Sequence, residues 1–178
     1  MTKKPLSKKQ HTDAMLRRRI KFVAEKGAMA RLFRAGTSQE LQEQVFRTLK
    51  PRKLASLATR DAYDRWLIRT IQSNCWRRFS RNGLSSDRWA YFAKLLNIVI
   101  YEIVSNRELF FDGDWRRIQH FLHIPIDSSV IDHVTKIDPR FPTITLLKGL
   151  TKKSYLDIQD FIRRVAAENK VPPIWFEA

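Results

Sequence analysis

The chain has 178 residues, of which 43% are hydrophobic, and this is enough apolar material to exclude a disordered chain. Only five glycines are present and no long stretch alternates apolar with polar residues, which excludes most sandwiches and barrels and predicts an all-α fold. Thirty-four Lys and Arg against eighteen Asp and Glu give a net charge of +16, so the expected partner is a nucleic acid, and the longest apolar stretch, 95–101, is far shorter than the roughly 20 residues of a membrane span.

The N-terminal segment concentrates this charge. Residues 1–31 hold ten basic and two acidic side chains, a net +8 that is half of the total excess. Such a segment is either a solvated tail or a basic arm that lies on phosphates, and we expect an arm over 1–35 followed by one helical domain over 36–178. Arg17, Arg18 and Arg19 are its candidate DNA contacts. No apolar signal core follows Met1, so a cytoplasmic, nucleoid-associated location is expected.

Two helices are predicted before the middle of the chain. Thr37 and Glu40 have the spacing of a capping box, and the helix that they start is expected to end at Pro51. Apolar residues at three- and four-residue steps then predict a longer helix over about 60–79. Cys75, in this helix, is the single cysteine, which excludes an internal disulfide and a cysteine-only metal site.

The end of that helix interleaves aromatic and basic residues over 76–82. Arginine pairs with phosphate in a bidentate fork and an aromatic face stacks on a base, so Arg77, Arg78 and Arg81 are candidate DNA contacts. The alternative is that Trp76 and Phe79 are core residues and the arginines only face water.

Further helices follow a break at Asn82-Gly83. Ser85 or Ser86 is expected to cap a second long helix that reaches Ile103. Shorter helices are predicted at about 115–122, 127–134 and 154–168.

Common catalytic motifs are missing from the sequence. It has no Gly-rich phosphate loop, no Gly-x-Ser-x-Gly elbow and no His-Glu-x-x-His. His120, His123 and His133 lack cysteines or carboxylates at ligand spacing, so we expect no metal and no organic cofactor.

The stretch 124–131, Ile-Pro-Ile-Asp-Ser-Ser-Val-Ile, places a carboxylate, Asp127, at a sharp turn before a helix. On its own this pattern is typical of an N-cap. It also resembles the turn that carries the catalytic aspartate of the helix-hairpin-helix DNA glycosylase superfamily, and most of all its archaeal 8-oxoguanine DNA glycosylase-like branch.

Two further segments carry the same resemblance, which covers roughly residues 85–178. The run 93–101 looks like the helix in which a catalytic lysine, here Lys94, precedes apolar residues, 33 positions before Asp127. The C-terminal 171–177 is similar to the branch's aromatic ending. The hairpin ahead of the lysine is glycine-rich in that branch, whereas this chain offers Asn-Gly-Leu-Ser-Ser at 82–86.

The resemblance implies a helix-hairpin-helix core and a DNA glycosylase that flips a damaged or modified base out of double-stranded DNA. Asp127 would then be the essential carboxylate, and Lys94 the nucleophile that forms a Schiff base with the sugar. Residues near these segments that could line the base pocket, with a place in the core as the alternative for each, are Trp89, Asn97, Trp115 and His123.

Two other functions explain the charge equally well. One is a DNA-binding protein without catalysis, such as a regulator or a mobile-element accessory factor, which needs neither Lys94 nor Asp127. The other is a ribosomal-type RNA-binding protein, which the full apolar helix faces and five tryptophans disfavour. No obligate protein partner is indicated.

Overall fold

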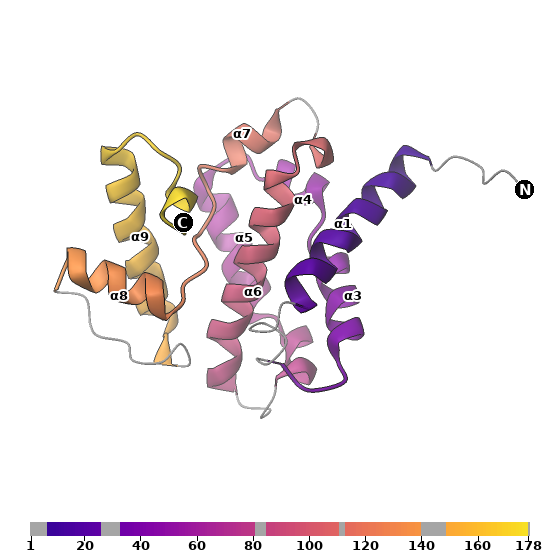
Figure 1. The fold of residues 1–178 in the computed structure, drawn as a ribbon, viewed down its shortest axis with the longest axis horizontal. Helices are drawn as coiled ribbons and strands as arrows, with labels where there is room; N and C mark the ends of the chain where they lie inside the picture. The colour runs from indigo at the N-terminus through magenta and orange to yellow at the C-terminus, as the bar shows by residue number, and fades with distance from the viewer. Residues whose placement is uncertain (1–6, 26–32, 81–84, 111–112, 140–148, 178) are drawn as a thin grey trace, which may run out of the picture.

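A computed structural model describes residues 7–25, 33–80, 85–110, 113–139 and 149–177, with the backbone alone at 85–88 and 176–177. Every regular element of these residues is helical, which confirms the all-α class (Figure 1). In chain order, with η for a 3-10 helix, they are α1 (Lys8–Glu25), α3 (Ser38–Thr48), α4 (Pro51–Ala55), α5 (Arg60–Gln72), η1 (Asn74–Phe79), α6 (Ser85–Ser105), η2 (Arg107–Leu109), α7 (Asp114–Ile118), α8 (Ser128–Ile137), α9 (Lys152–Glu168) and η4 (Pro173–Glu177).

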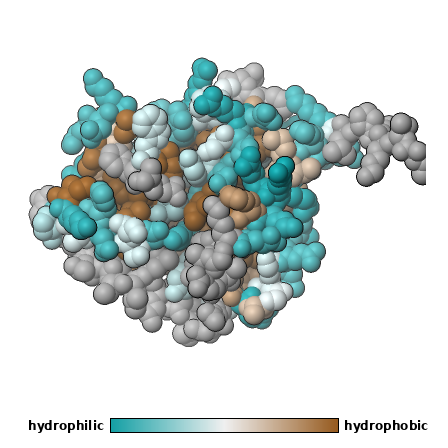
Figure 2. All heavy atoms as spheres, in the orientation of Figure 1, coloured by the Kyte–Doolittle hydropathy of each residue, from teal (hydrophilic) through white to brown (hydrophobic). Residues whose placement is uncertain are grey.

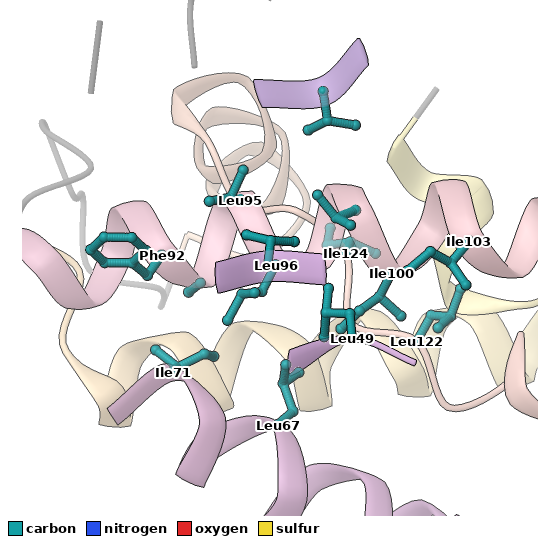
Figure 3. Packing of buried hydrophobic residues seen from close by; sticks show 14 of the residues in the cluster. Leu49, Leu67, Ile71, Phe92, Leu95, Leu96, Ile100, Ile103, Leu122 and Ile124 are labelled. Atoms are coloured by element: carbon teal, nitrogen blue, oxygen red, sulfur yellow. The ribbon is translucent and has the colours of Figure 1, made fainter. Parts of the chain in front are cut away.

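Helix α6 is the centre of the fold. It packs against α1, α5, α7, η1 and η2, and its apolar residues lie within the main core (Figure 3). A helix that is apolar on most of its surface is stable in water only when other elements surround it. The buried side chains that α6 supplies include Phe92, Leu95, Leu96, Val99, Ile100 and Ile103.

Helix α1 packs on α3 and α6. Leu16, Ile20 and Val23 are buried at three- and four-residue steps, which is the pattern of an amphipathic helix. Most of the predicted arm is therefore a helix whose apolar face belongs to the core, while the division of the chain at residue 35 stays a prediction.

The predicted helix over 60–79 is interrupted at Ser73. There the backbone is extended (φ −59°, ψ 138°), and the Ser73 side chain accepts a hydrogen bond from the N–H of Cys75 to start η1. The break lets the indole of Trp76 turn back and donate to the Thr70 carbonyl oxygen at 2.7 Å. Burying this large ring together with Phe79 outweighs continuation of the helix.

The helix ends near residues 37–51 also differ in detail. Thr37 precedes α3, but its hydroxyl donates to the Arg34 carbonyl oxygen and forms no capping bond. Pro51 begins α4 at its first position, where proline has no helical hydrogen bond to lose. The helices expected near 115–122, 127–134 and 154–168 correspond to α7, α8 and α9.

The two sides of the molecule differ in polarity. In the view of Figure 2, hydrophilic residues dominate the side that holds α1, and apolar residues gather toward α8 and α9. None of the helices that the structure describes is long and apolar enough to cross a lipid bilayer.

Candidate functional site

Lys94 and Asp127 meet in the folded chain. The Lys94 Nζ lies 3.1 Å from Asp127 Oδ2 and donates a hydrogen bond to it. Asp127 is also the N-cap of α8, because its Oδ1 accepts from the N–H of Val130 at 3.1 Å. The side chains keep 20% and 38% of their surface exposed, so the pair lies at the protein surface and water can reach it. Asp127 is therefore an N-cap, as the pattern alone predicted, and it also contacts Lys94.

The turn that carries Asp127 is fixed by backbone hydrogen bonds to two helices. The N–H of Ile124 donates to Gln159 Oε1 at 3.0 Å, and its carbonyl oxygen accepts from Gln159 Nε2 at 2.8 Å. Asn97 Nδ2, one turn of α6 beyond Lys94, lies 3.4 Å from the same oxygen. Gln159 and Asn97 thus give hydrogen-bond partners to the backbone of a buried segment that forms no helical hydrogen bonds of its own.

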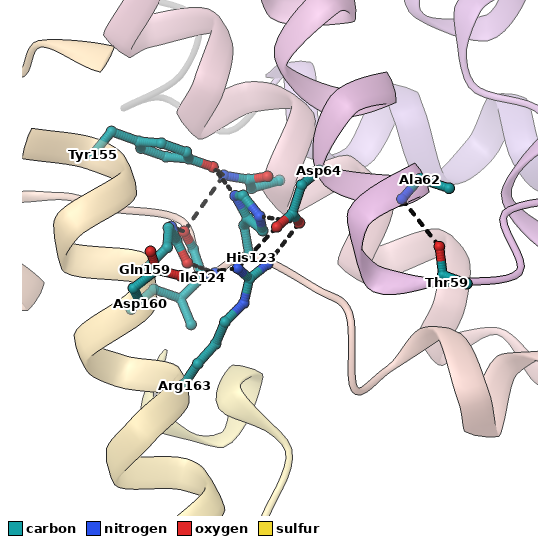
Figure 4. A network of polar contacts seen from close by, with 10 residues as sticks. Thr59, Ala62, Asp64, His123, Ile124, Tyr155, Gln159, Asp160 and Arg163 are labelled. Carbon is teal, nitrogen blue, oxygen red and sulfur yellow. Dashed lines mark hydrogen bonds and ion pairs between the residues drawn. The ribbon is translucent and has the colours of Figure 1, made fainter. Parts of the chain in front are cut away.

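Behind the turn lies a buried polar network (Figure 4). The ring of His123 connects Asp64, 2.8 Å from its Nε2, with the hydroxyl of Tyr155, 2.7 Å from its Nδ1. The same hydroxyl accepts from Asn97 Nδ2 at 2.8 Å. Arg163 donates to both Asp64 carboxylate oxygens, at 2.7 and 3.0 Å. We call these five side chains the Asp64–Arg163 network.

The charges in this network follow from burial and pairing. Burial lowers the pKa of His123, and although Asp64 opposes this shift, the ring stays neutral. Burial alone raises the pKa of Asp64, but the hydrogen bonds from His123 and Arg163 outweigh it and lower the value to about 2. A neutral His123 with the proton on Nε2 donates to Asp64 and accepts from Tyr155, whereas Asn97 Oδ1 and Arg163 Nε are buried without a hydrogen-bond partner in the described part of the chain.

Three of the four candidate pocket residues lie in or beside this network. Asn97 and His123 are each 1% exposed and belong to it. Trp89 packs edge-on against Tyr155, with ring centroids 5.0 Å apart. Trp115 lies apart from them, in a surface pocket near the C-terminal end of α6.

The candidate DNA-binding arginines differ in how they are held. Arg17 pairs with Glu43 and lies over the Phe46 ring, and Arg19 lies 3.7 Å from Glu102. Arg18 and Arg77 are exposed and form no ion pair within the described part of the chain. Arg78 stacks on Phe79, whereas Arg81 and most of the expected hairpin at 82–86 fall outside the described residues.

Sequence reasoning missed Asp64, Tyr155, Gln159 and Arg163. The last three stand four residues apart on the buried face of α9, so polar residues interrupt an otherwise apolar stripe. Such polar residues at core positions of an amphipathic helix need buried partners and are the signal that could have identified them.

Metal binding finds no support within the described residues, which contain no group of three or more His, Cys, Asp or Glu side chains able to hold an ion. His120 and His133 are exposed, and His123 uses both ring nitrogens in the network. Comparison with known proteins finds no matching family, no matching curated protein and no matching solved structure.

Proposed function

We propose that the chain is a DNA glycosylase in which Lys94 and Asp127 act on the sugar of a flipped nucleotide. The observation that carries the proposal is the 3.1 Å approach of Lys94 Nζ to Asp127 Oδ2. Residues 33 positions apart, which the resemblance pairs as nucleophile and carboxylate, lie together on the surface of a protein of net charge +16.

The pair has the groups that the reaction requires. Attack by the Lys94 amine on C1′ requires it to lose a proton, and Asp127 Oδ2 is within reach to accept that proton. The C1′–N bond then breaks, its electron pair leaves with the base, and the base takes up the proton that Asp127 had accepted, so that Asp127 is again a carboxylate. The C1′–O4′ bond of the sugar then opens as a proton passes from the lysine nitrogen to O4′, which leaves the Lys94 imine. While positive charge develops on the sugar, a nearby carboxylate lowers the energy of the transition state.

The surrounding protein holds this pair in place. Asp127 is fixed by α8 and by the turn that Gln159 and Asn97 bind, and Lys94 projects from the central helix. Groups held by packed elements lose little freedom when substrate binds, which favours catalysis. Exposed Arg18 and Arg77 offer contacts to DNA phosphates.

Base release and covalent trapping test the proposal on duplexes that contain damaged or modified bases. Borohydride added during turnover should join the protein to DNA through the Lys94 imine, and Lys94→Gln should abolish the adduct. Lys153→Gln is the matched control, because Lys153 forms an ion pair with Asp157 at 2.7 Å on an exposed helix face. Asp127→Asn should lower base release by about 100-fold or more, on the order of 3 kcal/mol in the barrier.

The possible results separate three functions. Base release without an adduct would keep the glycosylase and make water the nucleophile. Neither base release nor adduct, on any duplex tested, would leave a DNA-binding protein without catalysis. That second candidate is favoured by the charge alone and requires no role for Lys94.

A further inference from the structure

A pocket of about 180 Å³ opens at the C-terminal end of α6. Elements distant in the sequence build it, because α6, η2, the α7 region and η4 all contribute side chains. Its most buried lining residues are Val104, Leu122 and Ile174. The residues that line its rim are Tyr101, Ser105, Arg107, Trp115, Gln119 and Trp175.

Aromatic rings at this rim are unusually exposed. The Trp175 side chain is 66% exposed and that of Tyr101 is 37% exposed, although large aromatic residues stabilise a fold mainly by burial. The backbone holds Trp175 in place, because its N–H donates to the Pro172 carbonyl oxygen at 3.1 Å and the preceding Ile174 is buried. The pocket therefore presents exposed aromatic side chains, and the backbone that carries Trp175 is held in place.

The guanidinium group of Arg107 lines the pocket, and that of Arg116 lies beside the pocket residue Trp115. The Arg107 Cζ lies 4.3 Å from the ring centroid of Trp115, and the Arg116 Cζ lies 5.4 Å from it. The face of an aromatic ring attracts a cation. Here the guanidinium groups of Arg107 and Arg116 already lie close to the Trp115 ring, and their positive charge repels a cationic ligand. The complementary ligand is planar and carries negative charge.

We infer that this pocket binds a single nucleotide, with its base stacked on the exposed tryptophan and its phosphate paired with Arg107. Stacking on an aromatic side chain accepts any base, and arginine binds phosphate through a bidentate fork. The Ser105 hydroxyl and the Gln119 amide, both at the rim, offer hydrogen bonds to the base or sugar.

The pocket is separate from the Lys94–Asp127 pair. Tyr101 lies seven residues beyond Lys94 on α6, roughly 10 Å along the helix axis, and Arg107 lies farther still. A nucleotide held here is out of reach of the lysine, so the inference does not rest on the glycosylase proposal. The nucleotide is either free or part of a single strand.

Calorimetric titration with dTMP and with the tetranucleotide of thymidylate tests the site, with thymidine and inorganic phosphate as probes of its two halves. Trp175→Ala should weaken nucleotide binding about 5- to 150-fold, the range found when one stacked base is lost. Arg107→Gln should weaken dTMP binding more than it weakens thymidine binding, because thymidine has no phosphate. Saturable dTMP binding identifies a free nucleotide as a ligand, and binding of the tetranucleotide alone identifies a strand.

Two matched variants serve as controls. Phe22→Ala removes another exposed aromatic ring, on α1, and Lys153→Gln removes a cation from the exposed face of α9; neither should alter dTMP binding. Because the Trp175 ring is largely exposed, Trp175→Ala should keep its helical circular dichroism. If neither ligand binds, or if binding is unchanged in Trp175→Ala and Arg107→Gln, the inference is overturned.

Discussion

Asp127 uses its two carboxylate oxygens differently. Oδ1 caps α8, and Oδ2 faces Lys94. An Asp→Asn substitution keeps an oxygen for the cap and removes the negative charge, whereas Asp→Ala removes both. Asparagine is also among the best N-cap residues. The Asn variant therefore separates a chemical role of the charge from the structural role of the cap.

Asp64 makes the stability of the fold depend on acid pH. Its pKa is lowered from 3.8 to about 2, so its ionised form stabilises the folded chain above about pH 4, and this contribution is lost as the pH falls from 4 to 2. Burial also lowers the pKa of His123, so below pH 6.5 the unfolded chain binds a proton there more readily. Both shifts destabilise the fold at low pH.

Urea unfolding between pH 7 and 2 measures this dependence. Asp64→Asn should lower stability at neutral pH, because Arg163 loses the carboxylate that it binds through both oxygens and keeps only Asp160, and should flatten the decline between pH 4 and 2. Asp61→Asn, at an exposed position of the same helix, should keep the decline. An unchanged decline in Asp64→Asn would show that other carboxylates cause the acid sensitivity.

At the residue level, the sequence could single out Lys94 and Asp127 as a pair, and their catalytic roles stay a prediction. The motif-like turn and the spacing from Lys94 singled out both members of the pair, and the structure brings them together. The partners of His123 could not be predicted, because Asp64 is 59 residues away and contact at that separation depends on how the helices pack. Trp115 was predicted to line the same base pocket as His123 because the two are close in sequence, but in the folded chain α7 places Trp115 in the surface pocket at the C-terminal end of α6.

Helix α9 is the element on which the candidate site depends most. It supplies Tyr155, Gln159 and Arg163 to the turn and the network. Its start is held by a reciprocal capping box, in which Thr151 Oγ1 accepts from the N–H of Ser154 at 3.1 Å and Ser154 Oγ accepts from the N–H of Thr151 at 3.0 Å. Loss of that cap should lower the stability of the whole of α9.

Thr151→Ala should accordingly destabilise the protein by about 1 kcal/mol, the usual cost of removing an N-cap side chain. Thermal and urea unfolding of the variant measure the change. Thr12→Ala is the control: the Thr12 hydroxyl donates to the Lys8 carbonyl oxygen inside α1, and alanine favours a helix interior. Unchanged stability of Thr151→Ala would mean that the capping box adds nothing to stability.

Helices were predictable where local chemistry decides them. Periodic apolar residues located α3, α5, α6 and α9, because their burial on one face follows from the 3.6-residue repeat. The break at Ser73 was missed, since the same spacing continues through Trp76, and only the packed core shows that the indole must turn back to Thr70. Thr37 and Glu40 have the spacing of a capping box, but the Thr37 side chain forms no capping hydrogen bond.

At the scale of the whole molecule, the charge is not confined to a detachable arm. Leu16, Ile20 and Val23 of α1 are buried against α3 and α6, so removing residues 1–31 would open the core as well as remove charge. Substitutions at exposed positions of α1 are therefore the sound way to test how its charge contributes to binding.

Binding to duplex DNA should weaken steeply with salt if the excess charge contacts phosphates. About five such contacts give a slope near −4 to −5 when the logarithm of the binding constant is plotted against that of the salt concentration. Arg18→Gln should reduce this slope by about 1, because Arg18 is exposed and without an ion pair in the described part of the chain. Arg17→Gln should reduce it less, since Glu43 already neutralises Arg17.

Fluorescence anisotropy with a labelled duplex at several salt concentrations gives all three slopes, those of the unaltered protein, Arg18→Gln and Arg17→Gln. A flat response of the unaltered protein would contradict binding through phosphates, and equal slopes for the two variants would show that the ion pair with Glu43 opens when DNA binds.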